Sequence, residues 1–318
     1  MSIVADVRAN LVLPAFAAPM FLCSGPDLAI ASCKSGIVGS LTRNHCRDLA
    51  ELEQQLKTVR EALDRAADDG AAKTIGPLAV NISPNFSRAE FREHLETCRR
   101  YGVRIIVTSV GDPTDNAPLV QEYGLLHYHD ATTLRFAEKA AAADVDGIVC
   151  IGAGGGGHAG IVSHLAFVPK VREMFGGTIV MAGAITTGAA IRAGEVLGAD
   201  LAYLGTRLIA TRESSAPQAY KEMLVSAQVT DVVYTKAVNG MAASWLKPSL
   251  AEAGLDPENL VAPEGRSTDH LPPGKTPWRD IWSAGQGVGL ISDIPTVAEI
   301  VNRLRQEYAQ ACAVPAMT

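Results

Sequence analysis

The sequence lacks paired cysteines, a long uncharged apolar segment and any cluster of basic residues. Its six cysteines lie far apart, at positions 23, 33, 46, 98, 150 and 312, and none forms a CxxC pair. This usage is typical of reduced thiols in a cytoplasmic protein rather than of a disulfide framework. No segment reaches the roughly 18 apolar residues of a transmembrane helix. The N-terminus lacks the apolar core of a signal peptide.

The charge balance narrows the class of protein further. The net charge is −6 and no Lys/Arg cluster stands out, so the electrostatic footprint of a nucleic-acid-binding protein is missing. Hydrophobic residues make up 47% of the 318 residues, so the chain can bury a large core. This length suits a single large α/β barrel with an addition.

Short apolar segments alternate with helical patterns through the first two thirds of the chain. The eight expected strands cover residues 15–20, 37–41, 78–82, 104–109, 125–129, 147–151, 178–181 and 201–204. Near-continuous apolar strands that alternate with helices indicate a parallel sheet covered by helices. Eight such units favour a closed (β/α)8 TIM barrel over an open doubly wound sheet, and no GxGxxG turn follows the first strand.

The pattern changes after residue 226, where prolines accumulate. We expect three parts: a cofactor-binding barrel over residues 1–228, a small lid region over 229–277 that contacts substrate, and a C-terminal segment over 278–318. Residues 236–246 and 248–253 are interpreted as short helices, and residues 295–311 as a final helix that packs back on the barrel.

A glycine-rich run follows the sixth expected strand. It contains six glycines among the nine residues 152–160, together with His158. Glycines let the backbone approach a ligand closely and adopt positive φ. A neutral imidazole is a suitable base for a C–H acid at neutral pH. The run therefore predicts a cofactor edge with a proton acceptor beside it, although a flexible surface loop with an incidental histidine is the alternative.

The turns after strands seven and eight indicate a phosphate site. Gly183 and Gly205 allow backbone N–H groups to face an anion, and Thr206 adds a hydroxyl group. Phosphate sites of TIM barrels are often built at these two loops. The alternative is that both are ordinary turn glycines.

The other strand ends carry weaker signals. Met20 and Phe21 follow strand one, where apolar side chains can stack on a ring system or simply join the core. Strand three ends with Asn81-Ile82-Ser83, where the Asn81 amide or the Ser83 hydroxyl can contact polar atoms of a cofactor. His127 and His129 share one face of strand five but lack a third ligand, so we expect no metal site.

Four segments carry a resemblance to a known family. They are GGGGHAG (154–160), VMAGAITTGAAI (180–191), GADLAYLGTRLIATRES (198–214) and IWSAGQGVGLI (281–291). In order and spacing the chain resembles the nitronate monooxygenases, formerly called 2-nitropropane dioxygenases, over nearly its whole length.

The resemblance implies a TIM barrel with non-covalent FMN and a small lid-like domain. It implies His158 as the active-site histidine. The residues it implies near FMN are Met20, Phe21, Ser83, Gly156, Gly157, Gly183, Ala184, Gly205, Thr206 and Gln286. Some members carry a lysine at the end of strand five, where this chain has His129 and Asp130. A protonated His129 is one substitute for that cation.

The resemblance implies oxidation of alkyl nitronates or nitroalkanes, such as propionate 3-nitronate or 2-nitropropane, to a carbonyl compound and nitrite. The alternative is an FMN enzyme that uses NADH or NADPH to reduce quinones or enoyl thioesters, since such reductases share the glycine–histidine loop. A third reading is a barrel that binds a phosphorylated metabolite without flavin chemistry. The expected partner is a small molecule. A homodimer is compatible with the sequence, although no pattern specifies the oligomeric state.

Overall fold

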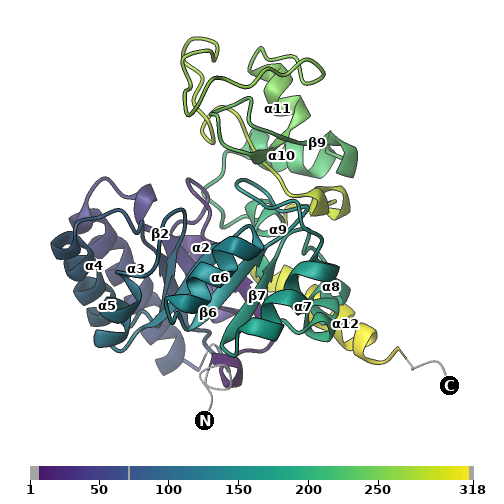
Figure 1. Ribbon diagram of the computed structural model, residues 1–318. Helices are drawn as coiled ribbons and strands as arrows, with labels where there is room; N and C mark the ends of the chain where they lie inside the picture. Colours follow the sequence, from purple (N-terminus) through teal and green to yellow (C-terminus); the bar gives the residue numbers. More distant parts are fainter. Residues whose placement is uncertain (1–6, 71, 315–318) are drawn as a thin grey trace.

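The computed structural model describes residues 7–70 and 72–314 (Figure 1). Eight parallel strands follow one another around a barrel in the order β1-β8-β7-β6-β5-β4-β3-β2. Their bounds are β1 (Ala15–Ala17), β2 (Gly39–Thr42), β3 (Leu78–Asn81), β4 (Ile105–Thr108), β5 (Leu126–Ala131), β6 (Gly147–Ile151), β7 (Thr178–Ala182) and β8 (Leu201–Leu204). The predicted TIM barrel is confirmed, and each of the eight predicted strands overlaps an observed one.

The two edge strands of this sheet approach each other. Phe16 of β1 forms a parallel bridge with Val38, the residue just before β2. The Ala17 N–H donates to the Val38 carbonyl at 2.8 Å, and the Val38 N–H donates to the Ala15 carbonyl at 3.1 Å. These bonds bring the barrel nearly to closure, which removes free strand edges.

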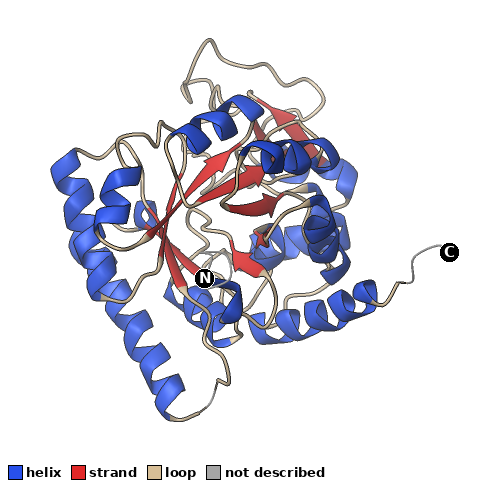
Figure 2. Ribbon diagram, turned by 60° about the horizontal axis from the view of Figure 1, so that its bottom comes forward, coloured by secondary structure: helices blue, strands red, loops and turns tan. Residues whose placement is uncertain are grey.

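Helices surround the strands (Figure 2). Along the barrel they are α2 (Pro26–Lys34), η1 (Arg43–His45), α3 (Leu49–Asp68), α4 (Arg88–Arg100), α5 (Ala117–Glu122), α6 (Leu134–Ala142), α7 (His164–Met174), α8 (Gly188–Leu197) and α9 (Thr206–Ile209). Figure 1 draws α10 (Gln218–Ser226) above these helices, in the upper part of the molecule. In α3, Asp48 caps the helix by accepting from the Glu51 N–H. Leu52, Leu56 and Val59 are buried because they recur with helical spacing on the face toward the sheet.

The barrel interior has its own apolar core. Inward-facing side chains from all eight strand regions form one cluster, in which the Phe16 and Tyr203 rings meet edge to face at 4.9 Å. Because strand side chains alternate between the two faces, Leu126 and Tyr128 of β5 point inward, and so does Asp130 two residues later. This alternation decides which side chains point into the barrel.

The lid region, residues 229–277, forms a small structure above the barrel (Figure 1). It contains η2 (Val229–Asp231), β9 (Val232–Thr235), the antiparallel β10 (Ala243–Leu246) and α11 (Lys247–Glu252). The helix predicted over 236–246 is wrong. Gly240, at φ +76°, lies in the connection between the strands, and β10 pairs with β9 instead. Pairing between segments outweighs weak local propensity here.

The C-terminal segment holds η3 (Gln286–Leu290) and α12 (Val297–Cys312). Thr296 and Glu299 form a capping box that starts α12. The helix packs closely on α8, where a Cβ added to Gly188 would lie 2.2 Å from the Leu304 carbonyl oxygen. The first residues of the segment pack elsewhere: Trp278 and Ile281 lie in the apolar cluster of the lid region.

The cysteines and the helices bear on two expectations from the sequence. All six cysteines are free, and only Cys312 is exposed. Within residues 7–70 and 72–314, none of the helices combines the length and apolar character needed to cross a membrane.

Candidate active site

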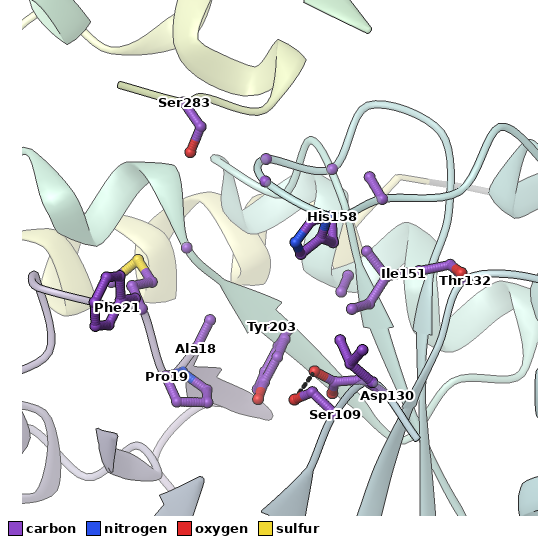
Figure 3. Close-up of a pocket in the computed structure, with 18 of the residues that line it drawn as sticks. Ala18, Pro19, Phe21, Ser109, Asp130, Thr132, Ile151, His158, Tyr203 and Ser283 are labelled. Carbon is purple, nitrogen blue, oxygen red and sulfur yellow. Dashed lines mark hydrogen bonds between the residues drawn. The ribbon is translucent and has the colours of Figure 1, made fainter. Parts of the chain in front are cut away.

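A cavity of about 1320 Å³ opens at the carboxyl ends of the barrel strands and reaches up to the lid region (Figure 3). This volume exceeds the roughly 300–1,000 Å³ typical of a single-ligand pocket, so it suits a cofactor together with a substrate. Ten of the predicted site residues line it: Met20, Phe21, His129, Gly156, Gly157, His158, Gly183, Ala184, Gly205 and Thr206. The structure thus brings together residues from five separate strand ends.

Ser83 and Gln286 do not line this cavity. The Ser83 hydroxyl accepts from the Asn85 N–H at 3.3 Å, within a turn after β3. At this strand end the cavity is lined by Asn81, the inward-facing last residue of β3. Gln286 is exposed, but its N–H donates to the Gly154 carbonyl at 2.9 Å. The WSAGQ segment therefore supports the glycine loop through its backbone.

His158 is held between the barrel and the lid region. The Gly157 carbonyl accepts from the Ser244 N–H at 2.9 Å, and the Ala159 carbonyl accepts from the Tyr234 hydroxyl at 2.9 Å. His158 itself bonds through Nδ1 to the Ala242 carbonyl at 3.3 Å. Three consecutive residues of the glycine loop are thus fixed by the β9–β10 hairpin, so the loop is a supported element.

The same bond defines the tautomer of His158. A carbonyl oxygen only accepts, so Nδ1 carries the proton and Nε2 keeps a free lone pair. Burial has the largest effect on the imidazole and lowers its pKa below 6.5. The hydrogen bond to the Ala242 carbonyl acts in the raising direction, and the positive charge of Arg266 adds a smaller lowering effect. The ring also meets Trp278 edge-on, with centroids 5.3 Å apart. His158 is therefore a neutral, oriented base at pH 7.

The turns after β7 and β8 converge on the glycine loop. Gly183 and Ala184 both have positive φ, +127° and +55°, which turns this loop sharply. The Ala184 N–H donates to the Gly154 carbonyl at 3.2 Å, so its hydrogen-bonding capacity is already used. The Thr206 hydroxyl accepts from the Gly285 N–H at 2.9 Å, which leaves its own O–H free to donate to a ligand.

Met20 and Phe21 form the apolar side of the cavity. Met20 is half-buried and lies beside the turn after β8, where a Cβ added to Gly205 would be 3.7 Å from its sulfur. Phe21 is 44% exposed, an unusual value for a large apolar ring. An aromatic face that lines a cavity without being covered suits contact with a planar ligand.

His129 lies on the other face of β5 from Asp130. The Thr108 hydroxyl bonds to His129 Nδ1 and to His127 Nε2, both at 2.7 Å. Burial lowers the pKa of His129 to about 4 and that of His127 to about 3, so both rings are neutral at pH 7. This lowering of the pKa is opposite to the raised pKa that a protonated His129 requires at pH 7. Among the described residues no group of three or more potential metal ligands exists.

The buried His127 makes the fold sensitive to acid. The pKa of His127 is lower in the folded chain than the value near 6.5 of the unfolded chain. The stability that the neutral His127 contributes is therefore fully present above pH 6.5 and is lost as the pH falls toward 3. We expect His127→Leu to reduce the slope of unfolding free energy against pH by about 1.4 kcal/mol per unit between pH 6 and 4. Urea unfolding at several pH values measures this slope, and an unchanged slope would contradict the assignment.

Sequence reasoning considered the Asn81 amide as a cofactor contact but assigned no role to three other inward-facing polar residues. These three are Ser109, Asp130 and Tyr203, at the carboxyl ends of β4, β5 and β8 (Figure 3). With Asn81, the last residue of β3, they form the floor of the cavity. The signal was present in the sequence. Counting in steps of two from the buried Leu126 and Tyr128 leads to Asp130 rather than to His129.

Eight parallel strands surrounded by helices, with a cavity at their carboxyl ends, define a TIM-barrel protein, and comparisons specify the family. The chain belongs to the nitronate monooxygenase family, whose members are flavin-dependent, because the family model matches residues 7–307. It is 26% identical to a nitronate monooxygenase of Paraburkholderia phytofirmans, with 94% of this chain and 93% of that protein covered.

Other relatives differ in their named reactions. The chain is 27% identical to the (3aS,4S,5R,7aS)-5-hydroxy-7a-methyl-1-oxo-octahydro-1H-indene-4-carboxyl-CoA dehydrogenase of Mycobacterium tuberculosis. That match covers 72% of this chain and 61% of the relative, so the chain spans about three fifths of it.

Solved structures share the fold. FabK from Thermotoga maritima has a TM-score of 0.75 at 23% identity, and the match covers 98% of this chain and 97% of that one. A nitroalkane oxidase from Streptomyces ansochromogenes has a TM-score of 0.75 at 22% identity, and the match covers 96% and 99%.

Proposed function

We propose that this protein is an FMN-dependent enzyme that oxidises alkyl nitronates, or the nitroalkanes from which they form, to a carbonyl compound and nitrite. The observation that carries the proposal is the orientation of His158, whose Nδ1–H is held by the Ala242 carbonyl while Nε2 stays free to accept a proton. The near full-length similarity to a named nitronate monooxygenase supports the same reaction.

The cavity has features that fit FMN. The turns after β7 and β8 bring Gly183 and Thr206 to its wall, and the free Thr206 O–H suits a phosphate oxygen. The exposed Phe21 ring suits a flat ring system. When bound, the flavin supplies the electron-accepting and oxygen-reacting chemistry of the reaction.

The protein's own part is to bind, orient and move a proton. His158 Nε2 would accept the α-proton of a neutral nitroalkane, or orient the nitronate anion when the substrate arrives already deprotonated. Trp278 and the β9–β10 hairpin cover the imidazole, which limits the access of water to the reacting carbon. We also propose that the lid region, residues 229–277, determines which substrate enters.

A second candidate is a flavin reductase that takes electrons from NADH or NADPH and acts on quinones or thioesters. The cavity volume of about 1320 Å³ favours it, because a small nitronate beside a flavin would leave much of this space unused. A relative named as a dehydrogenase of a CoA thioester points the same way.

Anaerobic stopped-flow reduction of the purified protein separates these candidates. We expect the bound cofactor to have the visible absorption of a flavin and to bleach when mixed with propionate 3-nitronate. Bleaching by NADH or NADPH but not by the nitronate would replace the oxidase proposal with the reductase. A colourless protein that takes up no FMN on reconstitution would exclude both.

A further inference from the structure

Asp130 places a buried carboxyl group in the floor of the cavity, and the proposed chemistry does not use it. Its Oδ2 accepts from the Ser109 hydroxyl at 2.8 Å, which Figure 3 draws as a dashed line. Its Oδ1 is inaccessible to solvent and has no hydrogen-bond partner among the described residues. An unsatisfied buried carboxyl oxygen is costly and is expected to have a functional reason.

The Ser109 bond belongs to a relay across three strand ends. The Asn81 amide donates to the Ser109 oxygen at 2.9 Å and to the Val107 carbonyl at 3.2 Å. Because Ser109 accepts from Asn81, its own proton is directed to Asp130. On the other side of the floor, the buried Tyr203 hydroxyl also lacks a partner among the described residues. Burial raises the pKa of Tyr203, and the charge of Asp130 raises it further.

The charges around Asp130 do not neutralise it. In the described part of the chain, no cation lies within ion-pair distance of its carboxyl group. The cations that line the cavity are committed elsewhere or lie at its mouth: Arg43 donates to His94 and to the Cys46 carbonyl, Lys139 lies 3.7 Å from Asp112, and Arg266 is on the exposed lid.

Further titratable groups line the same cavity. Those nearest to it in the fold are His129, on the outer face of the same strand, Tyr203 across the floor and His158 above, and the others are Cys23, Cys46, Asp112, Tyr220 and Tyr234. Both imidazoles are neutral at pH 7, as described above, so neither supplies a compensating charge. Burial then dominates and raises the pKa of Asp130 to about 7, while the Ser109 hydroxyl acts in the lowering direction.

We propose that Asp130 is a proton site coupled to the redox state of the bound flavin, taking up one proton from solvent when the cofactor is reduced. This inference rests on the flavin-binding part of the proposed function. Reduction adds negative charge to the cavity. This charge raises the pKa of a carboxyl group that lines the same cavity and so favours its protonated form. The electrons come from the substrate and the proton from water. On reoxidation the electrons leave to oxygen and the proton returns to solvent, so no bond to carbon changes at Asp130.

Asn81 and Ser109 are positioning residues in this arrangement. Their hydrogen bonds fix the carboxyl plane and favour its ionised form, so the group is not locked in the protonated state. Ser109→Ala removes the donor and is expected to raise the pH at which Asp130 titrates. A merely structural Ser109 would not move that titration.

Redox-difference infrared spectroscopy tests the proposal on the FMN-loaded protein, with dithionite as the reductant. Above pH 7 we expect reduction to generate the C=O band of a protonated carboxylic acid. The band should be absent from Asp130→Asn and retained in Asp112→Asn, a matched control at the exposed mouth of the cavity. The midpoint potential of the wild-type flavin should also fall more steeply with pH than that of Asp130→Asn, by about 30 mV per unit for one extra proton per two electrons.

The possible failures are distinguishable. A flavin that binds and is reduced without a new carboxylic-acid band, and with equal pH slopes in the two proteins, would overturn the role of Asp130 and leave the flavin site intact. A band that persists in Asp130→Asn would assign the proton to another group. Protein that binds no FMN would overturn the flavin proposal and, with it, this inference.

Discussion

Replacing His158 with asparagine is expected to lower kcat/KM for a neutral nitroalkane by about 10²–10⁴-fold, the usual contribution of a general base. The asparagine amide can still donate to the Ala242 carbonyl, so the loop geometry is kept while the basic nitrogen is lost. The loss should be much smaller for a preformed nitronate, because that substrate needs no deprotonation.

The pH dependence gives a second readout of the same base. Burial lowers the pKa of His158, so the imidazole stays unprotonated and active above its pKa and loses activity only below it. With a neutral nitroalkane, kcat/KM of the wild type should therefore fall on the acid side at a pH below 6.5, and His158→Asn should lack this limb.

His270 provides the matched control. It is an exposed histidine of the lid region that also bonds a backbone carbonyl, that of Ala237 at 2.6 Å, but it does not line the cavity. His270→Asn should keep the activity of the wild type toward both substrates. Equal losses in His158→Asn for nitroalkane and nitronate would show that the imidazole binds or orients substrate rather than accepting its proton.

The barrel was predictable from the sequence because its signal is local and repeated. Strands such as Gly147–Ile151 are short, apolar and separated by amphipathic helices, so each βα unit can be recognised without knowledge of its neighbours. The lid region offers no such repetition. Residues 236–246 contain β10, which is stabilised by pairing with β9 and by the buried Trp245, and neither contact is encoded in the local pattern.

The same distinction explains the site. The glycine loop and the turns at Gly183 and Gly205 were found because their composition is unusual at a strand end. Apart from the Asn81 amide, the floor of the cavity was not found, since Ser109 and Asp130 are ordinary polar residues whose importance depends on which face of the strand they occupy. Whether a backbone N–H is free is also a tertiary property, as the bond from Ala184 to Gly154 illustrates.

The largest effect on stability is expected from Trp245→Ala, at about 3–5 kcal/mol. Trp245 is fully buried in β10, and its ring stacks on Trp278 with centroids 4.2 Å apart. Removing it opens a cavity inside the small apolar cluster that also contains Leu250 and Ile281. Trp245→Phe should cost much less, because it keeps an aromatic ring and removes an indole N–H that has no acceptor among the described residues.

This substitution should also reach the active site through packing alone. Trp278 lies between Trp245 and His158, so loss of the stack frees the ring that covers the imidazole. Urea unfolding and hydrogen exchange measure the effect: protection should fall first in β9 and β10 and in the loop at residues 157–159, which the hairpin holds. Trp282→Ala is the control, since that half-buried ring stacks on Tyr220, belongs to a different cluster from Trp245 and does not itself line the cavity, so its loss should cost less. A loss of protection spread evenly over the barrel would contradict this path, because the cluster would then support the whole fold rather than the hairpin above His158.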